Sequence, residues 1–258
     1  MKIKWLGTAG FQISTGKEVF LIDPYLSRNS KAFPKQDLTP SDICTASGIF
    51  ISHGHFDHIL DVPQIALQTG ADIYCSGTAA DFFIRSGMGK QKIKLVLSDN
   101  AVFKFPEFTA QAFFSEHVRF DLPLILSTLM KINVRFFKYL PLVRNFPCGQ
   151  VLSWRFHVEN RIIQFFGSAG SSPAELEKMG DVPIDILMLP LQGHSDILRI
   201  GLDYVNLLKP AVVIPHHYDS FSPPISKMVD IKPFVDDMRK YHPEIRVMIP
   251  EMNTPLTL

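Results

Sequence analysis

The sequence contains few cysteines, and their spacing argues against any cysteine-based architecture. Cys44, Cys75 and Cys148 are odd in number, lie far apart and stand in apolar or turn segments. This pattern argues against a disulfide framework and against a cysteine-rich zinc site. We therefore predict reduced thiols and a cytoplasmic protein.

Strong net charge and long apolar runs are lacking too. With 26 basic and 25 acidic residues, the formal net charge is +1, so no overall field would attract nucleic acid. No uncharged apolar run is long enough to span a bilayer, and the N-terminal segment breaks at Gly7 before a signal-peptide core forms. Repeats and linkers are absent as well. We expect one domain over residues 1–258, with a sizeable core because 46% of the residues are hydrophobic.

Residues 52–58, with the sequence SHGHFDH, are the segment around which the chain is organised. Three of the nine histidines fall within six positions here, with an aspartate among them. Neutral imidazoles and carboxylates are ligands of zinc, manganese and iron, and a glycine lets the backbone turn tightly between two of them. Histidines in a polar turn can simply be solvated, but a packed His/Asp cluster at ligand spacing predicts a metal site.

Apolar patterning predicts two packed sheets with helices outside, because meanders are followed by βα units. We expect strands at 2–6, 10–14, 18–22, 47–51, 72–76, 92–97, 101–105, 109–114, 149–157, 161–166, 185–189, 211–215 and 245–249. Helices are expected at 62–67, 78–86, after Ser172, at 196–208 and at 232–241. The helix after Ser172 has an N-cap, a proline at its first position and a capping-box glutamate. Residues 25–42 are polar and contain two prolines, which predicts a long surface loop.

The segment from His53 to His58 resembles the HxHxDH signature of the metallo-β-lactamase-fold hydrolases. The opening residues 5–24 resemble the start of the UlaG-like branch, which is related to ascorbate-lactone hydrolases. Residues 189–194 (LPLQGH) and 214–218 (IPHHY) resemble that branch as well. The resemblance covers nearly the whole chain. It implies an α/β (α+β) fold, a four-layer αββα sandwich with metals in a cleft at one edge of the two sheets.

The resemblance also implies a set of metal ligands. Carried over residue by residue, they are His53, His55 and His117 for the first metal, and Asp57, His58 and His217 for the second. His117 also fits a second interpretation, a polar residue that merely ends a strand. His216 directly precedes the predicted ligand His217 and is open to three interpretations. It could hydrogen-bond to a metal ligand, face the substrate or be a packed imidazole.

Two positions depart from the family's pattern. Ser168 stands where the family usually has an aspartate that bridges both metals, and Thr8 stands where the UlaG-like opening commonly has a histidine. A neutral hydroxyl cannot supply the bridging negative charge, so one cation loses a strong ligand and is repelled by its neighbour. We therefore expect a second site that binds weakly, or that fills only when an anionic substrate bridges the two.

Residues 119–147 have the composition of an insertion after the His117 strand. The segment is mostly apolar, yet Lys131, Arg135 and Lys138 recur at the spacing of one helix face. One interpretation is a helix buried against the core with a solvated basic stripe. The other is a lid or interfacial helix that favours hydrophobic or lipid-like substrates, with a peripheral contact to an anionic membrane surface. The sequence leaves both open.

The resemblance implies a hydrolase that uses one or two divalent ions, zinc first and manganese or iron as alternatives. A bound cation lowers the pKa of its water toward neutrality, which suits attack on a phosphodiester, a lactone or another ester of a small molecule. Asp57 would ligate a metal and orient the nucleophile, and His194 or His216 would protonate the leaving group.

Three other functions are known for related folds or donor sets and are alternatives for this sequence. A nuclease of this fold would need a basic substrate face, which the near-neutral charge does not favour. A flavodiiron-type redox protein would have a glutamate where His55 stands. A non-catalytic metal-binding or sensor protein is the alternative from another class, and the serine at position 168 is the feature that supports it.

Overall fold

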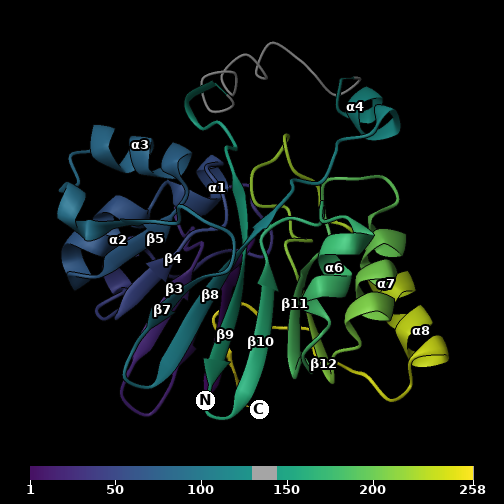
Figure 1. Ribbon diagram of the computed structural model, residues 1–258. Helices are drawn as coiled ribbons and strands as arrows, with labels where there is room; N and C mark the ends of the chain where they lie inside the picture. The colour runs from purple at the N-terminus through teal and green to yellow at the C-terminus, as the bar shows by residue number, and fades with distance from the viewer. Residues whose placement is uncertain (130–143, 258) are drawn as a thin grey trace.

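Two seven-stranded sheets form the centre of the part of the chain that the computed structural model describes, residues 1–129 and 144–257 (Figure 1). In spatial order, the first sheet consists of β14 (Pro255–Thr257), β1 (Lys2–Gly7), β2 (Gly10–Ser14), β3 (Val19–Ile22), β4 (Gly48–Phe50), β5 (Asp72–Cys75) and β6 (Ile93–Leu95). The second consists of β13 (Arg246–Val247), β12 (Val212–His216), β11 (Ile186–Pro190), β10 (Arg161–Phe166), β9 (Val151–Val158), β8 (Phe108–Ser115) and β7 (Ala101–Lys104).

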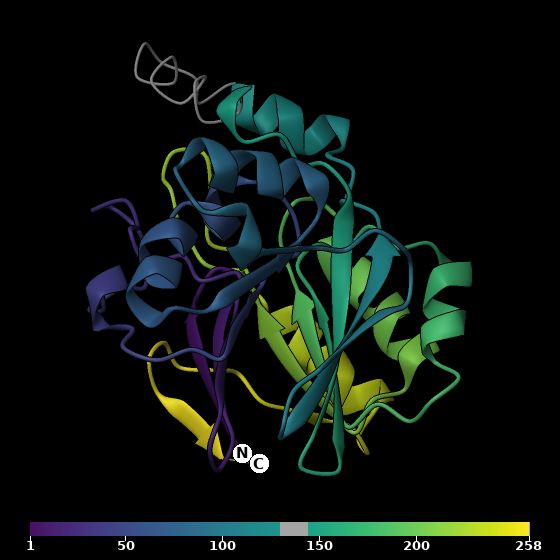
Figure 2. The same ribbon diagram turned by 60° about the vertical axis from the view of Figure 1, so that its left-hand side comes forward.

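Each sheet is antiparallel in one half and parallel in the other. β1, β2 and β3 form an antiparallel meander, whereas β3 to β6 run parallel. A long loop joins β3 to β4, and helices join β4 to β5 and β5 to β6. The helices outside the first sheet are α1 (Phe56–Ile59), α2 (Val62–Thr69) and α3 (Gly77–Arg85). Those outside the second are α6 (Pro173–Met179), α7 (Ile197–Leu208) and α8 (Lys232–Tyr241). Figures 1 and 2 show these two groups of helices on opposite sides of the sheets, which confirms the predicted four-layer αββα sandwich.

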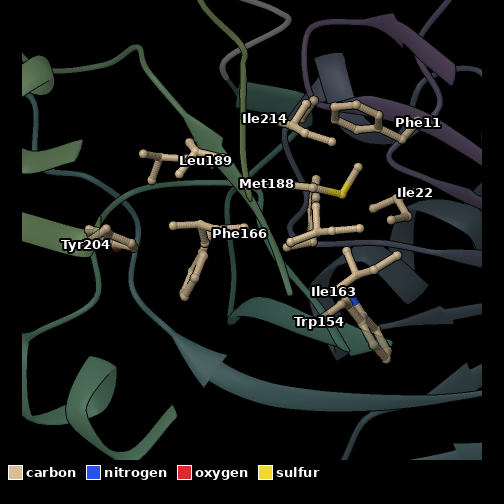
Figure 3. Packing of buried hydrophobic residues seen from close by; sticks show 14 of the residues in the cluster. Phe11, Ile22, Trp154, Ile163, Phe166, Met188, Leu189, Tyr204 and Ile214 are labelled. Carbon is tan, nitrogen blue, oxygen red and sulfur yellow. The ribbon is translucent and has the colours of Figure 1, made fainter. Parts of the chain in front are cut away.

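The main core lies between the two sheets, where large side chains from both inner faces interdigitate (Figure 3). Phe11 of β2 meets Phe165 of β10 edge to face, with ring centroids 6.3 Å apart. Trp154 of β9 is fully buried and donates its indole N–H to the Ile51 carbonyl at 3.0 Å. Because Ile51 directly precedes the histidine-rich segment, this bond fixes the start of that segment against the second sheet.

The predicted strands and helices are present, with three departures. The short helix α1 was not among the predicted elements. The short strand β14 was not predicted, because its pairing with β1 joins opposite ends of the chain and has no local signal. The predicted loop over residues 25–42 is present, but its first part is not wholly at the surface, since Tyr25, Leu26 and Ala32 are buried. That part of the segment packs inward because Arg28 forms an ion pair with the buried Asp219.

The segment after His117 forms a helix, α4 (Leu122–Leu129), beyond the edge of the sheets at which β8 and β10 end (Figures 1 and 2). Leu122 and Leu126 on this helix are exposed, by 73% and 57%. These two leucines are therefore not packed in the core. The basic stripe of Lys131, Arg135 and Lys138 lies outside the described residues and stays a prediction. No helix in the described ranges is long and apolar enough to cross a membrane.

Candidate metal centre

The histidine-rich segment leaves β4 and turns directly into α1. His55 occupies the N-cap position, and Asp57 and His58 lie in the first turn of the helix, where both are buried. The Gly54 N–H donates to the Cys148 carbonyl at 2.9 Å. A Cβ atom at Gly54 would lie 2.3 Å from the Pro147 carbonyl oxygen, so only glycine permits this close approach.

The first cluster of potential ligands contains three imidazoles and one thiol. His53 Nε2 and His55 Nδ1 lie 3.0 Å apart, and the His117 ring is centred 5.1 Å from that of His53 and 4.8 Å from that of His55. Cys148 completes this group: one ligand atom from each of the four residues lies within 4.8 Å of the others. The predicted first set is thus brought together, with a cysteine that the sequence had not indicated.

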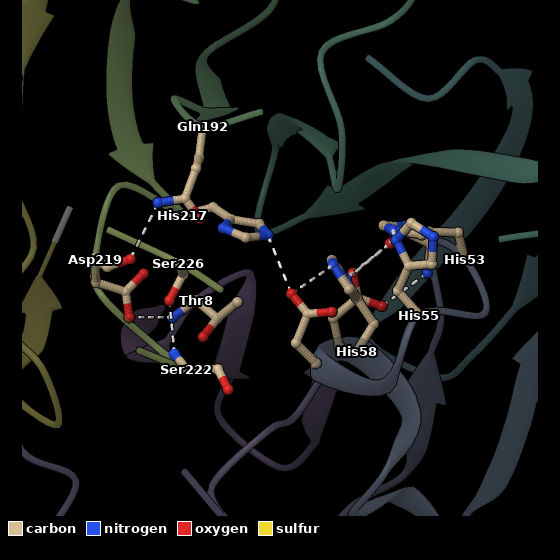
Figure 4. A network of polar contacts seen from close by, with 12 residues as sticks. Thr8, His53, His55, His58, Gln192, His217, Asp219, Ser222 and Ser226 are labelled. Atoms are coloured by element: carbon tan, nitrogen blue, oxygen red, sulfur yellow. Dashed lines mark hydrogen bonds and ion pairs between the residues drawn. The ribbon is translucent and has the colours of Figure 1, made fainter. Parts of the chain in front are cut away.

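The second cluster contains Asp57, His58 and His217, again with ligand atoms within 4.8 Å of one another. Asp57 Oδ2 lies 3.7 Å from His58 Nε2 and 3.4 Å from His217 Nε2. His217 adopts a left-handed backbone conformation, φ 53°, and its N–H donates to the Thr8 carbonyl at 2.9 Å. The clusters are adjacent, because the rings of His53 and His58 are centred 3.9 Å apart (Figure 4).

Buried hydrogen bonds orient the rings so that one nitrogen of each can bind a metal. His117 Nδ1 donates to the Val118 carbonyl at 2.8 Å, which leaves its Nε2 as the ligand atom. His58 Nδ1 donates to Asp23 Oδ2 at 2.7 Å. The Ser52 hydroxyl donates to the same carboxylate and lies 2.9 Å from His53 Nδ1. Such carboxylate and hydroxyl partners fix the tautomer of metal-binding histidines.

The pKa values in the clusters suit metal binding, which requires neutral imidazoles and an ionised carboxylate. Burial, reinforced by the neighbouring imidazoles, holds the pKa of His53 well below its ordinary value, and burial lowers that of His55 to about 4. Although burial raises the pKa of Asp57, the adjacent His58 and His217 outweigh it and bring this pKa well below its usual range. Although burial lowers the pKa of His58, the adjacent Asp23 and Asp57 carboxylates outweigh it and raise this pKa, so a metal ion at the second cluster would displace a proton. Both donor sets therefore fit divalent metal ions in composition, and His53 and His55 of the first set fit them in protonation as well.

Asp23 is a second residue, after Cys148, that sequence reasoning missed at this site. Its carboxylate is fully buried, accepts the Ser52 N–H at 2.7 Å and holds the His58 ring. The signal was present as a carboxylate at the end of the strand over residues 18–22. Its partners, however, lie 29 and 35 positions further along the chain.

We expect Asp23→Asn to weaken metal binding at the second cluster while leaving the first largely intact. The amide keeps the volume but supplies less negative charge to the His58 Nδ1–H, which makes Nε2 a poorer ligand. Substituting a residue that hydrogen-bonds to a metal ligand typically costs about 10- to 100-fold in metal affinity. Zinc titration by calorimetry would measure the loss; equal weakening of both binding events would indicate a general folding defect instead.

Ser168 is buried beside the first cluster, where its hydroxyl accepts the Val118 N–H at 2.9 Å. It therefore steadies the backbone next to His117. Its role as a metal ligand stays a prediction, as does the unequal occupancy of the two sites. We expect Ser168→Asp to tighten the weaker of two binding events in a zinc titration, because a carboxylate supplies the missing negative charge. Two equally tight events in the unchanged protein would contradict the argument.

The two histidines predicted as proton donors lie outside both of the clusters that the described residues form. His194 is partly exposed on the loop after β11, where its Nδ1 accepts the Asp196 N–H at 3.0 Å. His216 is fully buried and stacks on Phe165 with ring centroids 5.3 Å apart. Burial lowers the pKa of His216 well below its ordinary value. The structure places this ring in the core, and the catalytic role of either histidine stays a prediction.

The αββα sandwich with two adjacent clusters of potential metal ligands at one edge, together with the comparisons that follow, defines the class of this protein: a metal-dependent hydrolase of the metallo-β-lactamase superfamily. Within that class, the chain belongs to the family described as the Beta-lactamase superfamily domain, whose model matches residues 2–217.

The relatives agree with this assignment. The UPF0173 metal-dependent hydrolase of Carboxydothermus hydrogenoformans is 27% identical over 252 residues, covering 97% of each chain. Igni18, a metallo hydrolase from Ignicoccus hospitalis, is similar in structure with a TM-score of 0.72 at 19% identity, over 100% of this chain and 97% of that one. The isothiocyanate hydrolase from Delia radicum gut bacteria has a TM-score of 0.69 at 16% identity, over 100% and 99%. At such identities the structural likeness shows the fold alone.

Proposed function

We propose that this protein belongs to the UlaG-like branch of the superfamily and hydrolyses an ester-type bond, a phosphodiester or a lactone, in a small-molecule substrate. The observation that carries the proposal is the pair of adjacent donor sets, one centred on His53 and the other on Asp57. A bound divalent ion, zinc first and manganese or iron as alternatives, supplies an activated water and stabilises negative charge on the reacting group. The curated relative named a metal-dependent hydrolase supports the reaction class.

In this scheme the protein's own residues orient the attacking water and protonate the leaving group. Asp57 faces the Nε2 atoms of His58 and His217, so its carboxylate orients the attacking water as well as ligating metal. His194 suits proton donation to the leaving group: since Nδ1 accepts a backbone N–H, the ring proton of the neutral form is on Nε2. The His194 loop adjoins the site through Gly193, whose Cβ position would lie 2.6 Å from Val118.

The surroundings of His117 support an apolar group on the substrate. The Phe120 ring is centred 5.5 Å from that of His117, and it is exposed, as are Leu122 and Leu126 on α4. His117 also lines a pocket of about 430 Å³, together with Glu116 and Gln150. We propose that a hydrophobic tail lies along the exposed apolar residues, and that the segment 119–147 makes a peripheral contact with lipid.

The reaction is tested by measuring metal content together with hydrolysis of small esters, lactones and phosphodiesters. We expect purified protein to contain a transition metal by elemental analysis and to hydrolyse at least one class in the panel. Hydrolysis should stop when a chelator removes the metal and return when zinc or manganese is added. Metal-bound protein that cleaves nothing in the panel would favour the sensor function, and absence of metal after reconstitution would refute the proposal.

The apolar contact predicts a dependence on chain length. Burying apolar surface contributes roughly 25 cal/mol per Å², so losing two large side chains weakens long substrates selectively. We expect Phe120→Ser combined with Leu122→Ser to raise KM for long-chain esters while sparing short ones. Leu97→Ser, at an exposed leucine between β6 and β7, is the matched control. Equal loss on short and long substrates would show that the contact does not select substrate.

A further inference from the structure

Cys148 is the one member of the two clusters that the family resemblance does not assign. Its Sγ lies within 4.8 Å of ligand atoms of His53, His55 and His117. It is partly buried, whereas Cys44 is exposed and Cys75 is buried in the core behind the first sheet. A thiol grouped with three imidazoles is a donor set that zinc accepts in proteins, with four ligands in a tetrahedral arrangement.

The backbone around Cys148 is fixed against the ligand segment from both sides. Its carbonyl accepts the Gly54 N–H at 2.9 Å, and the Leu152 N–H donates to the Ser52 carbonyl at 2.7 Å. Gly149 adopts φ +67°, a conformation that favours glycine, and its Cβ position would lie 2.3 Å from Thr78. This segment is therefore positioned by the same loop that holds His53 and His55.

The flanking side chains anchor the segment further. The Phe146 ring is centred 5.0 Å from that of Phe82 on α3 and 6.3 Å from that of Phe56 on α1. Gln150 donates through its side-chain amide to the Ser115 carbonyl at 3.1 Å, close to the strand end that precedes His117. The thiol is consequently carried by a segment with contacts to the elements of all three histidines.

We propose that Cys148 is a ligand of the first metal site, so that this site consists of three imidazoles and one thiolate. The proposal rests on the proposed function only in requiring that a divalent metal binds here. On binding, the S–H bond breaks, the proton leaves to solvent, and a sulfur–metal bond forms, so the thiolate brings one negative charge into the site. Ser168 is neutral and cannot supply the negative charge of the family's bridging aspartate. The thiolate charge replaces part of that missing charge.

Two consequences follow for the choice and use of metal. A thiolate favours zinc over manganese, since manganese prefers oxygen donors. Four protein ligands also make the first site a closed one, whereas the three ligands Asp57, His58 and His217 leave a position open at the second. The second site is then the one at which water and substrate have access.

The test is cobalt substitution of the whole protein followed by absorption spectroscopy. A thiolate bound to Co²⁺ gives a strong near-ultraviolet charge-transfer band, while imidazole and carboxylate ligands give only weaker visible bands. We expect the near-ultraviolet band in the unchanged protein and in the control Cys44→Ser, and its loss in Cys148→Ala and Cys148→Ser. Zinc affinity of the tight site should fall by more than about 100-fold in Cys148→Ala, beyond the range for outer-shell partners.

A second readout is independent of the spectrum. In the Cys44→Ser background, stoichiometric zinc should protect Cys148 from an aromatic disulfide reagent. Because burial raises the pKa of this thiol to about 11, it reacts slowly even without metal, so the rates with and without zinc are compared. If the visible cobalt bands appear without the near-ultraviolet band, or zinc gives no protection, Cys148 is not a ligand and the proposed function stands unaffected. If no cobalt bands appear at all, the metal site and the proposed function fall together. Cys148→Ser keeps the side-chain volume, so loss of the band there, with an unchanged circular dichroism spectrum, is not an effect of misfolding.

Discussion

His53→Ala combined with His55→Ala is expected to abolish tight metal binding and to reduce hydrolysis by more than about 10³-fold, because each direct ligand should matter more than an outer-shell partner worth about 10- to 100-fold. The two ligand atoms, 3.0 Å apart, face the same point, so removing both leaves at most His117 and Cys148 there. Elemental analysis of the purified variant, together with its rate on the best substrate of the panel, measures the effect.

The fold should survive this double change. Both rings lie in the turn between β4 and α1, and neither belongs to the hydrophobic cores. His157→Ala provides a matched control, because His157 is an exposed histidine on β9. It pairs with Ile162 and Thr109 near the C-terminal end of this strand, which begins at Val151. The control should keep its metal and its rate. A double variant that retains stoichiometric metal would refute the placement of the first site.

The sequence predicted those features that depend on neighbouring residues. Alternating apolar residues predicted the strands, and the capping box of Ser172 and Glu175 is present at the start of α6. Six metal ligands besides Ser168, five of them histidines, were predicted through the resemblance to a family signature, and the structure brings these six side chains together in two clusters that could hold metal ions. Each of these signals lies within a few residues of the feature that it predicts.

The features that were missed are contacts between distant segments. Asp23 reaches His58 across 35 positions, and Cys148 meets His53 after four intervening strands, β5 to β8, and a segment that includes α4. The buried pair of Arg28 and Asp219 is separated by 191 positions. No local pattern distinguishes these polar side chains from solvated ones, because their burial results from how the two sheets pack.

That buried pair has the largest expected effect on stability. The Arg28 and Asp219 side chains are 2% and 0% exposed, and burial both lowers the pKa of Arg28 and raises that of Asp219, against the attraction between the two. Asp219 Oδ2 also accepts the Thr8 N–H at 3.0 Å, and the Thr8 carbonyl accepts the N–H of His217, a member of the second cluster (Figure 4). The pair thus supports the turn that positions the second cluster.

Asp219→Ala is therefore expected to destabilise the protein by about 3–5 kcal/mol, because it leaves the Arg28 guanidinium buried without its counter-charge. In urea unfolding this appears as a lower midpoint with an unchanged slope. Zinc binding at the second cluster should weaken in the same variant, since the Thr8 turn loses its acceptor. Asp236→Ala, which removes an exposed pair with Lys232 on α8, should leave both the midpoint and the zinc titration unchanged. An Asp219→Ala midpoint equal to that of the unchanged protein would mean that water reaches Arg28 and that the pair does not hold the turn.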